Sequence, residues 1–289
     1  NSGPYCAAPV NIHRIDWMWA NKAVFDANGI SVPTSWDELN AAAEKLQAAG
    51  IIPFAHGGQA WQDATVFEAV AMGIGGNNYY KNCYVDLKET CLRSETTVKV
   101  FDQMRKLQGF TDEGSPGRDW NVATGMVIEG KAGFQIMGDW AKGEFTAAGK
   151  VPGVDYYCAA TPSNNGYLYN VDSFIFYKTS DPDKQEGQKL LAKLMMGKNF
   201  QKVFNLYKGS IPARLDVPMD EFDKCAKTSN SDIKTAGASG GLVPSFAHGM
   251  AQGNTMKAAL QDVITEHFNS DMSSVDAANA LADSVLDNM

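Results

Sequence analysis

The sequence lacks the short motifs that most often signal enzymatic chemistry. It has no GxxxxGK[ST] phosphate-binding loop, no GxGxxG after a strand and before a helix, and no GxSxG around a serine nucleophile. It has only four histidines, and they are far apart, without HExxH or any other metal-ligand spacing. We therefore expect no cofactor, no structural zinc and no metal-dependent hydrolase.

Long apolar runs and clusters of basic residues are also missing. No stretch approaches the run of about 18 apolar residues that spans a membrane. The net charge is −8, without runs of Lys or Arg, which argues against nucleic acid as a partner. The N-terminal stretch "NSGPYCAAPV" has neither a basic region nor an apolar core, so no signal peptide is visible; a mature, processed or truncated chain has this appearance.

Cysteine is scarce, but its placement is informative. The five cysteines lack CxxC spacing, and Cys83 and Cys91 enclose the short polar loop "CYVDLKETC", which suits a local disulfide and an oxidising compartment. Cys158 and Cys225 offer a second pair, which would leave Cys6 unpaired. The alternative is that all five are buried thiols.

Strand and helix patterns alternate along the chain, which predicts an α/β protein with mainly parallel or mixed sheets. The clearest helix covers residues 35–49, with Ser35 and Glu38 as a capping box and Gly50 after its end. The stretch "GYLYNVDSFIFYK" (residues 166–178) is rich in aromatic and β-branched residues and predicts one strand. Residues 229–241, rich in Ser, Gly and small side chains, suggest a surface loop.

An amide and a carboxylate, Asn170 and Asp172, lie in the middle of that apolar strand. Side chains two positions apart on a strand share a face, so these two project together. Asp accepts two hydroxyl donors, whereas Asn both donates and accepts, so the pair suits the hydroxyl groups of a sugar. The alternative is that both satisfy backbone groups where strands cross.

Other polar and aromatic residues lie in loops at the expected strand ends, where α/β proteins bind ligands. They are Lys208, His248, Trp140, Gln59 and Trp61. Lysine donates hydrogen bonds, and indole rings pack against the C–H faces of sugars. Each has a simpler interpretation: a solvated lysine, an exposed loop histidine, or tryptophans that pack in the core or in a lid. Trp17 and Trp19 are assigned to packing.

A pair of catalytic acids is the main alternative to a binding cleft. Glycosidases place two carboxylates about 5 to 9 Å apart on either side of the scissile bond. Asp139 and Asp172 occupy the most suitable contexts, although almost any chain of this size offers such a pair. The signal for an enzyme is therefore weak.

Several uncommon motifs agree in order and spacing with one family. They are "AAPVNIHRIDWMWANKAVFDANGI", "PTSWDELNAAAEKLQAAGIIPFAHGGQAWQ", "KAGFQIMGDWAKGEF", "YNVDSFIFYK", "YKGSIPAR" and "LVPSFAHGM". Over essentially the whole chain, the sequence resembles the extracellular solute-binding proteins of ABC sugar-uptake systems, and in particular the glucose-binding proteins of Gram-negative bacteria.

This resemblance implies a two-lobed α/β protein of the type II periplasmic-binding fold, which closes on a sugar by hinge motion. Asn170, Asp172, Lys208 and His248 match positions that hydrogen-bond sugar hydroxyls. Trp140 matches the aromatic residue that stacks on the pyranose ring. Gln59 and Trp61 match a cleft-facing loop less closely.

The resemblance also implies a domain arrangement that is incomplete in lobe one. Lobe two is expected to comprise residues 8–155 and 215–289, and residues 156–214 the returning part of lobe one. Family members normally begin with a substantial segment of lobe one; the alternatives are that this N-terminal segment is a second, cleaved chain of the same protein that acts as a partner, an omitted fragment, or truly absent. Without it, the 156–214 part is expected to expose a sheet edge and an apolar face.

The expected function is therefore periplasmic binding of a monosaccharide, glucose being favoured, and its delivery to a membrane ABC permease without chemistry. A glycosidase or other carbohydrate-processing enzyme is the first alternative. A sensory or adhesive module that uses the same fold is the second.

Overall fold

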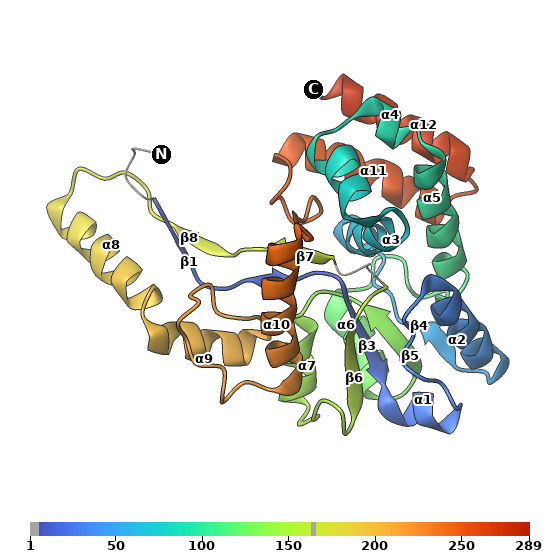
Figure 1. Cartoon of the computed structure of the whole chain (residues 1–289), viewed down its shortest axis with the longest axis horizontal. Coiled ribbons are helices and arrows are strands. Elements are labelled where there is room, and N and C mark those ends of the chain that lie inside the picture. Colours follow the sequence, from blue (N-terminus) through green and yellow to red (C-terminus); the bar gives the residue numbers. More distant parts are fainter. Residues whose placement is uncertain (1–5, 163–165) are drawn as a thin grey trace.

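The computed structural model describes residues 6–162 and 166–289. Helices and short strands form a body, and one arm projects from its side (Figure 1). In the described ranges no helix combines the length and the apolar character needed to cross a bilayer. The fold is α/β, as predicted.

The largest sheet has four strands and lies in the body. Its order is β4 (Ile52–Phe54), β5 (Ala132–Ile136), β3 (Trp17–Asn21) and β6 (Tyr156–Ala160). β4 and β5 are parallel, whereas β3 is antiparallel to both β5 and β6. The sheet is thus mixed. β6 begins just beyond the expected lobe boundary at residue 155, yet it pairs along the full length of β3.

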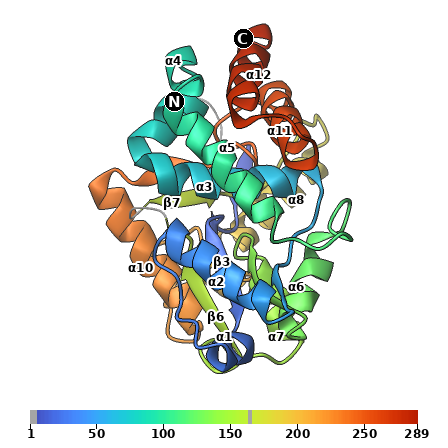
Figure 2. The same cartoon turned by 90° about the vertical axis from the view of Figure 1, so that its right-hand side faces the viewer.

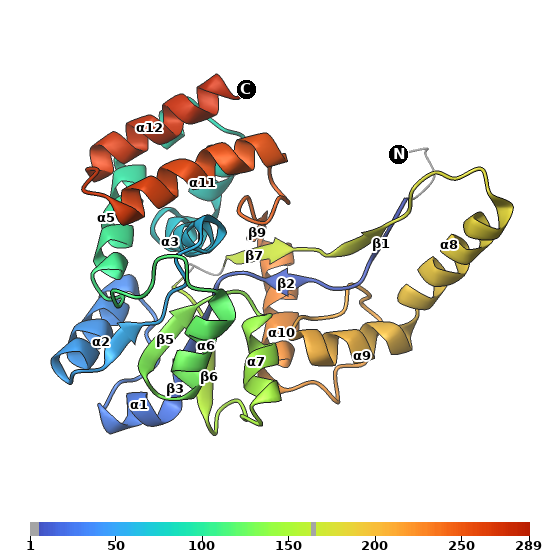
Figure 3. The same cartoon turned by 180° about the vertical axis from the view of Figure 1, so that it is seen from behind.

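Two smaller sheets connect the body to the arm. One contains β2 (His13–Arg14), β7 (Tyr167–Asn170) and β9 (Leu242–Pro244). The other pairs β1 (Ala7–Pro9) with β8 (Ser173–Ile175). The same N-terminal segment thus supplies one strand to each sheet, and Figure 3 shows the two sheets following one another toward the arm.

The prediction of one strand over residues 166–178 was wrong, because the chain breaks between β7 and β8. At the break, the Asp172 amide donates to the side-chain oxygen of Asn11 at 2.8 Å. The Asp172 carbonyl accepts from the Val10 amide at 2.9 Å. Asp172 therefore lies at the step between two sheets rather than in the middle of a strand.

Most of the remaining described chain is helical. The helices are α1 (Lys22–Ala27), α2 (Trp36–Ala48), α3 (Ala60–Tyr80), the π-helical turn η1 (Lys81–Val85), α4 (Glu89–Leu92), α5 (Glu95–Gln108), α6 (Trp120–Ile128), α7 (Ala141–Ala147), α8 (Pro182–Met195), α9 (Lys198–Lys208), α10 (Lys224–Ser239), α11 (Asn254–Asn269) and α12 (Ser274–Asp287). The predicted cap of α2 is present, because Ser35 accepts from the Glu38 amide at 3.2 Å.

Helix α10 contradicts the loop predicted over residues 229–241. Its Ser, Thr, Asn and Gly residues have low intrinsic helix propensity, which long-range contacts can override. Asp223 caps its first turn by accepting from the Ala226 amide, and Gly240 ends it at φ 73°. The Cys158–Cys225 disulfide ties the same first turn to β6.

Both predicted disulfides are present. The Cα atoms of Cys83 and Cys91 lie 5.1 Å apart, and those of Cys158 and Cys225 lie 6.0 Å apart, within the usual range. Cys6 is unpaired and exposed. The first bridge closes the turn after α3, and the second holds α10 against the large sheet.

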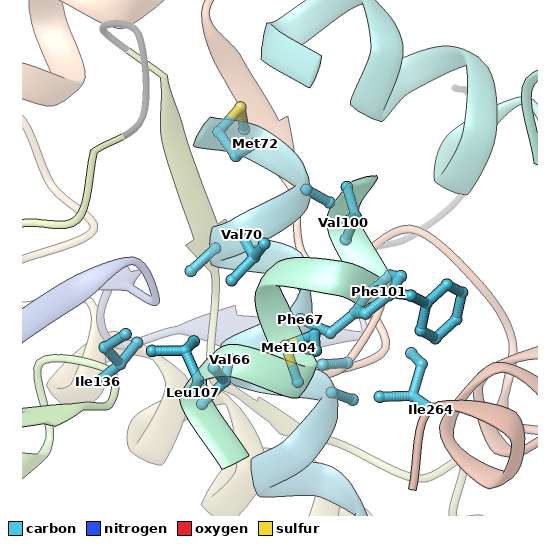
Figure 4. Close-up of a cluster of buried hydrophobic side chains, with 14 of the residues drawn as sticks. Val66, Phe67, Val70, Met72, Val100, Phe101, Met104, Leu107, Ile136 and Ile264 are labelled. Carbon is cyan, nitrogen blue, oxygen red and sulfur yellow. The ribbon is translucent and has the colours of Figure 1, made fainter. Parts of the chain in front are cut away.

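The main core lies between α3, α5, α11 and the large sheet. Phe67 of α3 packs on Phe101 of α5 with ring centroids 5.0 Å apart, and Ile264 of α11 joins the cluster (Figure 4). Figure 2 shows these helices together above the sheet, with α12 beside them. Buried apolar area of this kind stabilises a fold by about 25 cal/mol per Å². The core fixes α3, which later supplies three residues to the candidate site.

The arm contrasts with this body. β8 pairs with β1 and leads into α8, which lies at the outer part of the arm, whereas α9 runs back toward the body and contacts α7 (Figures 1 and 3). Leu190 and Leu194 on α8 are 60% and 61% exposed, and Tyr207 on α9 is 79% exposed. The arm thus leaves large apolar side chains exposed, whereas the corresponding side chains of the body are packed in its core.

Candidate functional site

A cavity of about 540 Å³ lies where the arm joins the body. It is lined by His13, Trp61, Trp120, Trp140, Gly143, Glu144, Asn170, Asp172, Tyr207, Lys208 and His248. Six of the seven site residues predicted from the sequence are in this group. They come from β7, from the step before β8, from the starts of α3 and α7, from the end of α9 and from the loop after β9.

Asp172 is the most constrained polar residue of the cavity. Its carboxylate accepts from the Asn11 amide at 2.9 Å, from His13 Nε2 at 3.0 Å and from the Asn170 amide at 3.1 Å. The hydrogen bond from His13 holds the pKa of Asp172 well below its usual range. The side chain is still 41% exposed, so a fixed negative charge faces the cavity.

His13 lines the cavity and was not predicted from the sequence. It is buried on β2, and its Nδ1 hydrogen-bonds Asp139 while its Nε2 hydrogen-bonds Asp172. Burial alone would lower the pKa of His13, but the two carboxylates outweigh burial and raise the pKa to about 9. His13 is therefore an imidazolium at neutral pH, and it holds Asp172 in place.

Asp139, the second acid of the enzyme alternative, does not line the cavity. It is buried, with one carboxylate oxygen on His13 and the other accepting from the Arg14 amide at 3.0 Å. Asp139 and Asp172 thus bind the same imidazole ring from its two nitrogens. They do not face each other across a space that a glycosidic bond could occupy.

His248 also lines the cavity but has different partners. Its Nε2 is 3.0 Å from Thr65 Oγ1 of α3, and its backbone amide donates to Ser245 Oγ at 3.1 Å. Ser245 in turn donates to Glu68 at 2.6 Å. Burial lowers the pKa of His248 to about 3, so this ring is neutral.

Glu68 anchors the loop that carries His248. Besides Ser245, it accepts from the Phe246 amide at 3.1 Å and from the Tyr80 hydroxyl at 2.9 Å. Burial raises the pKa of Glu68 to about 7 despite these hydrogen bonds, which favour the charged form. Helix α3 therefore positions His248 twice, through the ring and through the backbone of its loop.

The indole rings of Trp61, Trp120 and Trp140 line the cavity, and we call them the aromatic wall, with Trp140 at its centre. Its ring meets His13 and His248 edge-on, with centroids 5.2 and 5.0 Å apart, and Trp61 lies at 6.3 Å. Trp120 extends the wall and was not predicted. Indole faces of this kind pack well against the C–H groups of a sugar ring.

Gln59 is the predicted site residue that the structure places outside the cavity lining. Its side-chain oxygen accepts from Trp61 Nε1 at 2.8 Å, and its amide donates to Asp119 at 2.7 Å. Both ends of the side chain are thus engaged by the protein. Gln59 orients Trp61.

Lys208 ends α9 and brings a positive charge to the cavity. Gly209 follows it at φ 93°, and a Cβ atom there would lie 2.4 Å from the Asp139 carbonyl oxygen, so only glycine permits this close approach. In the described part of the chain, the Lys208 ammonium has no ion-pair partner. Glu144 and Tyr207 complete this side and were not predicted.

Comparison with known proteins agrees with this architecture. Residues 1–195 match the model of the bacterial extracellular solute-binding protein family. A protein named "probable sugar-binding periplasmic protein" from Brucella suis biovar 1 (strain 1330) is 48% identical over 98% of this chain and 67% of its own length. A protein of the same name from Rhizobium meliloti (strain 1021) is 45% identical over 98% of this chain and 68% of its length. The chain thus spans about two thirds of these relatives.

Solved structures share the fold at low sequence identity. The bacterial solute receptor AcbH, described as having an exclusive preference for β-D-galactopyranose, superposes with a TM-score of 0.82 at 18% identity, over 98% of this chain and 72% of its own. A chitin oligosaccharide binding protein superposes with a TM-score of 0.77 at 17% identity, over 100% of this chain and 72% of its own.

Proposed function

This chain belongs to the bacterial extracellular solute-binding proteins, and from that premise we propose that it is a periplasmic receptor for a glucose-like monosaccharide. It delivers the sugar to a membrane ABC importer and carries out no chemistry. The names of its curated relatives, which span more than the chain itself, support a sugar as the ligand.

The observation that carries the proposal is the set of groups that meet in one cavity. A fixed carboxylate (Asp172), an amide (Asn170) and an unpaired ammonium (Lys208) lie beside the indoles of the aromatic wall. Sugars present both hydroxyl rims and apolar C–H faces, so they use both kinds of surface. A ligand without hydroxyls would leave these polar groups unpaired, at a cost of about 1–3 kcal/mol each.

A monosaccharide is favoured over a longer sugar by how closely the polar groups are spaced. The Asn170 amide lies 3.1 Å from Asp172, so neighbouring hydroxyls of one ring can engage both. A solved receptor of this fold is described as preferring a single hexose, although another binds chitin oligosaccharides. The fold alone therefore does not choose between them, and the choice rests on the cavity.

Closure by hinge motion has a structural basis where the arm meets the body. Three chain segments cross there side by side: the Val10 amide donates to the Asp172 carbonyl, and Ile12 and Ile211 exchange backbone hydrogen bonds at 2.8 and 3.1 Å. Asp172 and Lys208 lie next to these crossings. A ligand that contacts both sides shifts the equilibrium toward the closed form.

We also propose that the exposed face of the arm is covered by a segment of the longer protein. The curated relatives are about half as long again as this chain. The apolar side chains on α8 and α9 supply a contact face for such a segment. In this arrangement residues 8–155 and 215–289 supply most of lobe two, which β6 joins through its pairing with β3, and the arm within residues 156–214, with β1 paired to β8, belongs to lobe one.

The test is a calorimetric titration of the purified protein with glucose, followed by recovery of the sugar. Saturable 1:1 binding with glucose returned unchanged is expected, and Asp172→Asn should abolish the heat. Asp271→Asn, an exposed aspartate outside the cavity, serves as the matched control. Glucose recovered in altered form would overturn the proposal, whereas heat only with an oligosaccharide would overturn the monosaccharide assignment.

A further inference from the structure

Resting on the proposed function, we propose that Thr65 fixes the tautomer of His248. In this tautomer His248 Nδ1 faces the cavity as a hydrogen-bond acceptor and selects a ligand hydroxyl that donates. Thr65 is thus a positioning residue that acts on ligand specificity without touching the ligand.

The Thr65 hydroxyl has a single proton, and the direction of this proton decides the tautomer of His248. Thr65 is buried on α3, and its Oγ1 donates to the Trp61 carbonyl one turn earlier at 2.7 Å. A hydroxyl has one donor hydrogen and two acceptor lone pairs. Because the proton is directed at Trp61, the 3.0 Å contact with His248 Nε2 requires the imidazole to donate. Nε2 therefore carries hydrogen.

Because His248 is neutral, hydrogen on Nε2 means that Nδ1 carries no hydrogen. The ring packs against Trp61 and Trp140, with centroids 5.9 and 5.0 Å away, and these faces offer no carboxylate to stabilise a second proton. The charged ring of His13, which contacts the same Trp140 ring, further disfavours a second cation and outweighs the opposite effect of Asp172. A neutral imidazole with hydrogen on Nε2 has a bare lone pair on Nδ1.

The lone pair on Nδ1 is available to a ligand. Among the described residues Nδ1 has no hydrogen-bond partner, and it is not one of the fully buried unpaired atoms, so it is open to the cavity that His248 lines. Asp172 is also an acceptor only. The cavity therefore places two acceptors where the ligand must supply hydroxyl hydrogens, and it disfavours ether, ester or phosphate oxygens at these positions.

The tautomer is measured on the free protein by nitrogen NMR of the imidazole rings. In the wild type, His248 should show a protonated Nε2 and an unprotonated Nδ1. Thr65→Val removes the acceptor while keeping the shape of the side chain, and the His248 signals should move toward a tautomer mixture. Thr65→Ser restores the hydroxyl and should restore the wild-type signals. Hydrogen on Nδ1 in the wild type would overturn the inference, whether or not any sugar binds.

The consequence for specificity is measured with glucose and its mono-O-methyl ethers, in which one hydroxyl at a time loses its donor hydrogen. Thr65→Val should weaken glucose binding roughly three- to tenfold, the effect of one neutral hydrogen bond, and Thr65→Ser should bind like the wild type. One methyl ether that the wild type rejects should be discriminated less strongly by Thr65→Val.

The matched control is Thr97→Val, which removes a buried threonine hydroxyl far from the cavity. If Thr65→Val distinguished glucose from each methyl ether as strongly as the wild type does, the inference would also be overturned. If no sugar binds to the wild type, the proposed function fails, and the NMR result alone decides the tautomer.

Discussion

Two histidines contact the same indole ring and yet differ in charge: one is an imidazolium and the other is neutral. His13 and His248 both stand edge-on to Trp140, at 5.2 and 5.0 Å. The pKa of His13 is raised to about 9, whereas that of His248 is lowered to about 3. His13 is buried and His248 is partly buried, and burial lowers the pKa of both rings, so burial does not explain the difference. The groups at their ring nitrogens do.

The difference shows how one site can hold both a permanent cation and a neutral acceptor. His13 has a carboxylate at each nitrogen, and the attraction of these two negative charges outweighs the unfavourable burial of the imidazolium. His248 has a threonine hydroxyl at one nitrogen and the cavity at the other. His13 thus belongs to the scaffold that fixes Asp172, and His248 presents a lone pair to the ligand.

The largest expected effect comes from removing the buried carboxylate partner of His13. Asp139→Asn should lower the free energy of unfolding by about 3–5 kcal/mol, because it leaves a buried cation with one counter-charge fewer. Urea denaturation at pH 7 measures the loss, and NMR titration should show a lower pKa for His13. Asp271→Asn should stay within about 0.5 kcal/mol of the wild type. A loss below about 1 kcal/mol for Asp139→Asn would contradict the ion-pair assignment.

The second effect is a loss of stability at alkaline pH. The folded-state pKa of His13 lies above its ordinary value of 6.5, so its contribution is complete below about pH 6.5 and is lost as pH rises through about 9. The rise in pKa corresponds to roughly 3 kcal/mol. Glu68, with its pKa raised to about 7, loses most of its own contribution between about pH 4.5 and 7; it is present in both the wild type and His13→Gln, so the difference between their curves isolates His13.

The free energy of unfolding is measured for the wild type and for His13→Gln at several pH values between 7 and 9. The wild-type curve should fall and the variant curve should be nearly flat over that interval. Parallel curves would show that His13 does not titrate there.

The sequence was a good guide to elements whose signals are local. The capping box and the apolar spacing of residues 35–49 predicted α2, and the polar pair Asn170 and Asp172 pointed to the cavity because only two positions separate them. Lys208, His248 and Trp140 were expected from their loop positions at strand ends, and the resemblance to a known family assigned them roles in sugar binding. All three line the cavity.

What the sequence did not reveal depends on contacts between distant segments. Asp139 and Asp172, the partners of His13, lie 126 and 159 residues further along the chain. No short-range motif could therefore indicate that His13 belongs to the site. Helix α10 forms despite poor propensity because a disulfide and the Asp223 cap hold its first turn. The strand break at Asp172 arises from its hydrogen bonds to Asn11 and Val10.

The smallest expected effect is the sharpest test of the contrast between the two histidines. If His13 stays charged and His248 stays neutral, neither ring changes its charge between pH 5 and 8, and Asp172 stays ionised because its pKa is lowered. Glucose affinity should then vary less than about threefold over this range, the remaining variation arising from Glu68 behind the His248 loop. Titrations at half-unit pH steps measure it. A tenfold step near pH 6.5 would mean that one of the two rings titrates as an ordinary histidine, and the His13→Gln variant would identify which one.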